Sequence, residues 1–175
     1  MKKSLIDQLS QYAAYHRDRR NIATHFIGIP MIVLAVATLL ARPSFDVAGF
    51  PLSPATLVTV ATAVFYLRLD VRFGAAMGML LALTLWFAQV WAAGSTMLWL
   101  SMGLGLFVVG WAFQFVGHHY EGRKPAFVDD VVGLIIGPLF VVAELAFMLG
   151  LRAEVQHAIE ARVGAVKGSR AAKAA

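Results

Sequence analysis

Long apolar stretches, each close to the length needed to cross a bilayer, are the strongest constraint on the fold of this chain. About 20 apolar residues span the hydrocarbon core as a helix. Hydrophobic residues make up 59% and charged residues 14% of the 175-residue chain, whereas soluble domains average about 45–50% and about 25%. This composition excludes intrinsic disorder and predicts an all-α polytopic membrane bundle. The four predicted spans cover residues 22–41, 55–67, 73–93 and 97–117, and a fifth apolar stretch covers residues 131–151.

The N-terminal segment predicts an amphipathic helix and not a signal peptide. Leu5, Leu9, Tyr12 and His16 recur at spacings of 4, 3 and 4 residues, which places them on one face of a helix. Asp7 interrupts the apolar core that a signal peptide would need. We expect this helix to lie on the membrane surface or against the bundle, with His16 directed inward.

The charges predict how the chain is oriented in the membrane. Lys and Arg number 15 against 10 Asp and Glu, a net charge of +5. In a chain this apolar, basic residues gather on the cytoplasmic side, so no nucleic-acid partner is expected. The basic N-terminus is therefore placed in the cytoplasm. Two crossings return residues 68–72 to that face, and four crossings return residues 118–130 to it. The chain contains no cysteine, which excludes disulfides, iron–sulfur clusters and thiol nucleophiles.

The fifth apolar stretch contains the pair Gly137-Pro138. A full fifth crossing would carry the basic C-terminal tail to the outside, against the charge rule. A re-entrant segment broken at Gly137-Pro138 is therefore favoured over a fifth span. The predicted organisation is one integral membrane domain, residues 1–152, and a charged, partly disordered cytoplasmic tail, residues 153–175. Both termini would then face the cytoplasm, at a bacterial inner membrane or, in a eukaryote, at the endoplasmic reticulum.

The same topology gathers four of the five histidines at one depth on the cytoplasmic face. His16 and His25 flank the start of the first span, and His118 and His119 end the fourth, whereas His157 lies in the tail. On one continuous helix His16 and His25 would lie roughly 13 Å apart on opposite sides. A shared site therefore requires a break between them, after which Asn21 is a plausible N-cap for the first span.

A polar stripe on the fourth span favours a metal site. Gln114, His118 and Glu121 recur at spacings of 4 and 3 residues. Imidazole and carboxylate together suit iron, zinc or manganese, and two or three histidines with one carboxylate and open positions are typical of non-haem Fe(II) oxygenases.

Each histidine taken alone also fits a structural role at the interface. Glu144 fits either a hydrogen bond to a ligand or a helix contact, Asp70 fits pairing with its arginine neighbours, and the glycine series 103, 110 and 117 fits close helix packing.

These residues also carry a resemblance to a known family. The run Tyr15-His16 with Asn21, His25 and Pro30, followed by the segment 114–118, Glu121, the segment 123–126 and Asp129, resembles the yeast-type 2-hydroxy fatty acid dioxygenase family. The resemblance implies a small membrane protein, of the endoplasmic reticulum in fungi, that requires Fe(II). It implies removal of one carbon from a 2-hydroxy fatty acid by α-oxidation, in a route that degrades phytosphingosine.

By position, the resemblance implies a set of site residues. His16, His25 and His118 would hold iron and act in catalysis with Glu121. The family spacing between histidine and glutamate is one residue longer, so His119 is an alternative ligand. The residues expected around the substrate or behind the ligands are Arg123, Lys124, Gln114, Asp129, Glu144 and Asn21.

The expected partners are a 2-hydroxy fatty acid, dioxygen and membrane lipid. A 2-hydroxy acid can chelate Fe(II) through its carboxylate and hydroxyl oxygens, so no separate 2-oxoacid is required. The competing interpretation is a non-enzymatic membrane scaffold or small transporter whose histidines are structural. The sequence leaves the oligomeric state and the preferred chain length open.

Overall fold

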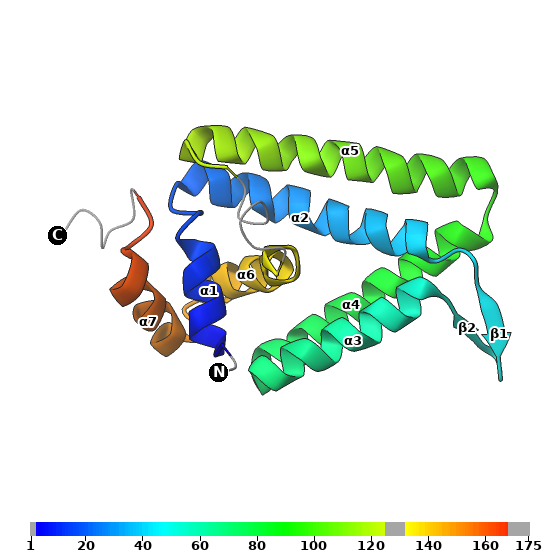
Figure 1. Cartoon of the computed structure of the whole chain (residues 1–175), viewed down its shortest axis with the longest axis horizontal. Coiled ribbons are helices and arrows are strands. Elements are labelled where there is room, and N and C mark those ends of the chain that lie inside the picture. Colours follow the sequence, from blue (N-terminus) through cyan, green and yellow to red (C-terminus); the bar gives the residue numbers. More distant parts are fainter. Residues whose placement is uncertain (1–2, 125–131, 168–175) are drawn as a thin grey trace. The chain divides into compact units, whose positions relative to one another are not determined.

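The computed structural model describes residues 3–124 and 132–167 of the chain. Its elements, drawn in Figure 1, are helices and one short hairpin: α1 (Leu5–Ala13), α2 (Arg19–Leu40), β1 (Phe45–Val47), β2 (Phe50–Leu52), α3 (Pro54–Leu69), α4 (Val71–Ala93), α5 (Thr96–Glu121), α6 (Gly133–Met148) and α7 (Ala153–Val163). The predicted all-α membrane class is confirmed. The described residues pack as two compact units, one from residues 3–29, 112–124 and 132–167 and the other from residues 30–111.

Three helices, α2, α4 and α5, are long and apolar enough to cross a membrane. The predicted second span corresponds to α3, which has 16 residues and is shorter than the length of a typical span. Helices α6 and α7 together pass the same length and composition test, but they are bent by 113° where they meet. By length and composition, the described residues therefore hold three candidate spans, or four if the bent pair is one broken span.

The predicted break at Gly137-Pro138 is wrong. Helix α6 continues through Pro138, and the chain turns only after Met148, where Gly150 and Arg152 adopt positive φ angles of 73° and 57°. Proline removes one backbone donor from a helix, but membrane helices tolerate this loss when neighbouring groups satisfy the freed carbonyl. The bend therefore lies where the apolar stretch gives way to the charged tail.

The unit of residues 30–111 is built around the helical hairpin of α3 and α4. Asp70 ends α3 and caps α4 by accepting a hydrogen bond from the Phe73 amide at 2.9 Å. A Cβ at Gly74 would lie 2.5 Å from the Leu67 Cα, so the missing side chain lets the two helices approach closely. The segment between the first two predicted spans, residues 42–54, contains the antiparallel pair β1–β2, a hairpin too short to show a periodic sequence pattern.

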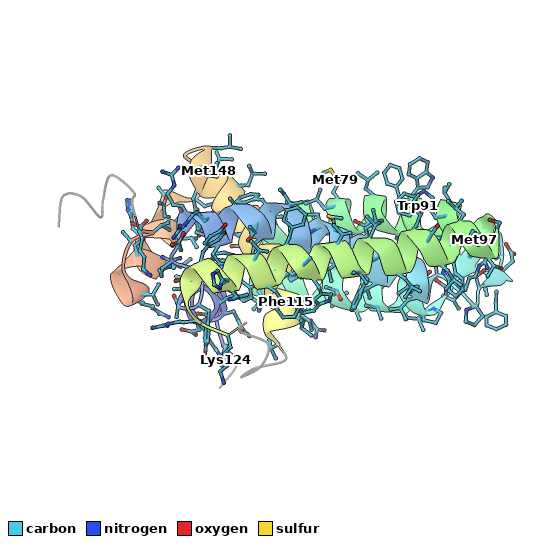
Figure 2. The ribbon with its side chains drawn as sticks, turned by 90° about the horizontal axis from the view of Figure 1, so that it is seen from above. Met79, Trp91, Met97, Phe115, Lys124 and Met148 are labelled. Atoms are coloured by element: carbon cyan, nitrogen blue, oxygen red, sulfur yellow. The ribbon has the colours of Figure 1, made fainter. Side chains whose placement is uncertain are left out.

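The surface of this unit is largely apolar. Met79 and Met97 are 74% and 77% exposed, and both project outward in Figure 2. Leu57 and Val108 are likewise exposed, at 61% and 66%. An apolar surface of this extent is typical of a protein surrounded by lipid, which agrees with the membrane association predicted from composition.

In the other unit, which contains both ends of the described chain, α1 packs against α6 and α7, as Figure 1 shows. A capping box between Ser4 and Asp7 begins α1, and the predicted apolar face of α1 is buried. Its partners are Phe140 and its neighbours on α6 and Val155 and Ile159 on α7. An ion pair at 2.7 Å between Arg162 and Asp7 joins α7 to α1, so residues 153–163 of the predicted tail form an ordered helix that packs against α1.

Candidate metal centre

Three histidines from separate segments meet inside the unit that holds α1, α6 and α7. His16 lies between α1 and α2, His25 lies in the second turn of α2, and His118 lies near the end of α5. Each offers one ligand nitrogen, and these atoms lie within 4.8 Å of one another. The three residues are 0%, 1% and 6% exposed. They form the His cluster, and it is the one group of three or more metal-ligating side chains among the described residues.

Backbone hydrogen bonds fix the tautomers of two of these rings. His16 Nδ1 lies 2.8 Å from the carbonyl oxygen of Tyr12, and His25 Nδ1 lies 2.9 Å from that of Asn21. A carbonyl oxygen only accepts, so each Nδ1 donates and each Nε2 carries a lone pair. This arrangement, with the far nitrogen held by a carbonyl, is typical of histidines that ligate metals.

The remaining nitrogens are placed as metal ligands would be. The Nε2 atoms of His16 and His25 face each other at 3.0 Å, and two lone pairs at that distance repel unless a cation lies near both. Metal–nitrogen bonds are about 2.0–2.1 Å long, so a single ion would reach both atoms at this separation. His118 Nδ1 is buried without a hydrogen-bond partner in the described part of the chain. The donor set therefore fits a divalent metal.

The local sequence explains how His16 reaches this position. Helix α1 ends at Ala13, the chain turns through hydrogen bonds from the His16 and Tyr15 amides, and α2 begins at Arg19. The predicted break between His16 and His25 is therefore confirmed. The predicted N-cap at Asn21 is wrong, because Asp18 accepts from the Arg20 amide through its side chain at 2.8 Å and α2 starts two residues earlier than Asn21.

Aromatic side chains shield the cluster. The Tyr12 ring stacks on His16 with centroids 4.2 Å apart and planes 4° from parallel, and Phe140 lies 5.5 Å from the same imidazole. Burial holds the pKa of His16 well below its usual range, and the nearby His25, His118 and Arg17 lower it further, against the hydrogen bond to Tyr12. His16 is therefore neutral at pH 7, the state that binds metal.

Comparison with known proteins decides the family. The family model described as 2-hydroxy-palmitic acid dioxygenase Mpo1-like matches residues 2–149. The chain belongs to the Mpo1-like family. It is 34% identical over 169 residues to 2-hydroxy-palmitic acid dioxygenase MPO1 of Saccharomyces cerevisiae, across 91% of this chain and 94% of that protein. No solved structure shows a significant match. The resemblance inferred from the histidine blocks is confirmed.

The Mpo1-like chain places the other predicted residues around the cluster. His119 is exposed and is not part of the cluster, so His118 is the histidine that the structure brings to the other two. Glu121 is buried and accepts hydrogen bonds from backbone amides of the His16 segment. Asn21 donates to Glu121 at 3.1 Å, and Gln114 is buried with no hydrogen-bond partner for its Nε2 among the described residues.

The remaining candidates are not members of the His cluster. Arg123 donates to the Ala14 carbonyl at 3.0 Å, and Lys124 is exposed near the end of α5. Glu144 forms an ion pair with Arg17 at 3.9 Å. Asp129 lies outside the described residues. The roles assigned to these residues from sequence stay predictions.

Two residues around the cluster were missed from the sequence. Arg17 is only 8% exposed and donates to the carbonyls of Ala13, His16 and Gly164, although in sequence it is one more basic residue beside a span. Tyr12 was recognised only as part of an apolar face. The available signal was its spacing of four residues from His16. At that spacing the backbone carbonyl of Tyr12 lies beside the His16 side chain, just after the end of α1.

The lowered pKa of His16 predicts acid sensitivity of the metal-free Mpo1-like protein. In the unfolded chain this imidazole takes up a proton near pH 6.5, whereas in the folded chain its pKa lies well below that value. Below pH 6.5 the unfolded state therefore binds more protons than the folded state. The free energy of unfolding should then fall as pH decreases from about 6.5, by about 1.4 kcal/mol per pH unit for each such proton. Chemical unfolding in detergent between pH 5 and 8 measures this slope. His16→Gln should reduce it, and a slope equal to that of wild type would contradict the prediction.

Proposed function

We propose that this chain is a membrane-embedded, Fe(II)-dependent dioxygenase that converts 2-hydroxy fatty acids to fatty acids one carbon shorter. The observation that carries this proposal is the His cluster: three buried imidazoles, two with fixed tautomers, converge from distant segments of a chain in the Mpo1-like family. The yeast relative is a 2-hydroxy-palmitic acid dioxygenase. A scaffold or transporter gives no reason for lone pairs of two buried rings to face each other at 3.0 Å.

His16, His25 and His118 would hold the metal. A bound ferrous ion supplies Lewis acidity, redox capacity and open coordination positions for substrate and dioxygen. The chain's own contribution is preorganisation. The carbonyls of Tyr12 and Asn21 hold two rings in the ligand tautomer, so little reorganisation is needed when metal binds.

The surrounding residues determine access and charge. Tyr12 and Phe140 cover the His16 ring and exclude water from that side. Arg123 and Lys124 lie within six residues of His118 on the exposed end of the same segment, where they would attract the substrate carboxylate. With the acyl chain among the apolar helices, the site would lie at the cytoplasmic face of a bacterial inner membrane or of the endoplasmic reticulum.

The experiment is metal analysis together with turnover of 2-hydroxypalmitate by the purified full chain in detergent. We expect about one iron per chain, and a fatty acid one carbon shorter under air but not under nitrogen. Reconstitution with Zn²⁺ in place of Fe²⁺ should give a metal-loaded but inactive protein, since zinc has no redox chemistry. Turnover that proceeds without oxygen, or iron-loaded protein without turnover, would refute the dioxygenase proposal and favour the scaffold or transporter.

A further inference from the structure

The carboxylate of Glu121 is buried beside the His cluster, but its oxygens are directed at other partners. Its side chain is 3% exposed. Oε2 accepts hydrogen bonds from the backbone amides of Arg17 at 2.9 Å and Asp18 at 2.7 Å, and from the side-chain amide of Asn21 at 3.1 Å. Oε1 lies 3.7 Å from the Lys167 ammonium. Oε2, with three N–H donors, has no lone pair left for a metal, and neither carboxylate oxygen of Glu121 belongs to the group of ligand atoms that gathers at the His cluster.

The three donors belong to the segments that carry the other two histidines. Arg17 and Asp18 directly follow His16 in the chain. Asn21 supplies the backbone carbonyl that receives His25 Nδ1. Glu121 itself lies one helical turn after His118 on α5. One buried carboxylate therefore joins the His16 segment, the start of α2 and the end of α5.

The electrostatics of this contact are favourable. The amides of Arg17 and Asp18 lie directly before the first residue of α2, beside the end of the helix where the dipole presents positive charge. A carboxylate there makes charge-assisted hydrogen bonds, which are about twice as strong as neutral ones. A neutral side chain of the same shape would keep part of this network and lose its charge.

We propose that Glu121 is a positioning residue that sets the spacing of the three metal-binding histidines and is not itself a ligand. This inference rests on the proposed metal centre. It predicts that loss of the Glu121 charge weakens metal binding through the placement of His16 and His25, while the set of atoms that touch the metal stays the same.

The test is titration of the metal-free full chain with Co²⁺ alone, followed by visible absorption, for wild type and Glu121→Gln. Loss of a group that orients metal ligands typically costs about 10–100-fold in affinity, so we expect the Co²⁺ dissociation constant to rise within that range. At saturating Co²⁺ the absorption bands should match those of wild type, because the ligands are unchanged. Glu121→Asp, which keeps the charge, should lie between the two in affinity.

The matched control is Glu154→Gln on α7, where the carboxylate pairs with Arg152 at 2.7 Å and is 65% exposed. It should leave the dissociation constant at the wild-type value. An unchanged dissociation constant in Glu121→Gln would overturn the positioning role, and altered bands at saturation would overturn it in favour of direct ligation. If wild type itself binds no Co²⁺, the proposed metal centre fails and this inference fails with it, whereas the outcomes above leave the metal centre intact.

Discussion

His25→Ala should reduce bound metal from about one ion per chain to a small fraction and should abolish dioxygenase turnover. The ring is 1% exposed, and its Nε2 lies 3.0 Å from the Nε2 of His16. Its removal takes away one of three ligand nitrogens and leaves only two. Because loss of a group that merely orients a ligand costs about 10–100-fold in metal affinity, loss of a ligand should cost more than about 100-fold. Metal content per chain and initial rates with 2-hydroxypalmitate measure the effect.

The chain provides matched controls for this experiment. His119 and His157 are exposed and lie outside the His cluster, so His119→Ala and His157→Ala should keep wild-type metal content and turnover. His119→Ala is the stricter control, because it changes the residue next to His118 on the same helix. Full metal content in His25→Ala, with a folded protein by circular dichroism, would remove His25 from the site. Loss of metal in His119→Ala would assign the ligand to the neighbouring position.

The convergence of the histidines could be predicted because it depends on topology and spacing. With the four crossings predicted from sequence, parity predicts that the start of the first span and the end of the fourth share a face, and the polar segment between His16 and His25 predicts a break. Both signals depend on hydrophobic length and charge, which are properties of the sequence alone. The choice between His118 and His119 could not be made in this way, because either residue ends the same helix.

The hydrogen-bond partners of Glu121 and the position of the bend depend on packing. The spacing of Glu121 from His118 predicts a shared helical face, and in the structure the carboxylate accepts hydrogen bonds from the two amides just before α2. Pro138 predicts a break from its missing donor, but α6 continues through it. The donors to Glu121 come from a segment about 100 residues away in sequence, and its spacing from His118 does not reveal them.

Gly117→Ala should destabilise the fold and weaken metal binding together. A Cβ at this position of α5 would lie 2.5 Å from Asn21 Oδ1 and 3.3 Å from His25 Nδ1, and still closer to the Thr24 hydroxyl. The start of α2 would have to move away from α5 to admit one methyl group. Overpacking of this kind costs about 1–3 kcal/mol, and the displaced groups include the ring nitrogen of His25 that is held by the Asn21 carbonyl.

Gly105→Ala on the same helix is the matched comparison, because a Cβ there meets nothing within 4 Å. Alanine is favoured over glycine by about 1 kcal/mol within a helix, so this variant should be as stable as wild type or slightly more stable, with unchanged metal affinity. Thermal unfolding in detergent and Co²⁺ titration of the two variants give the comparison. Equal behaviour of the two alanines would mean that α2 and α5 do not approach at Gly117. Lower stability of Gly117→Ala with unchanged metal affinity would separate helix packing from the placement of His25.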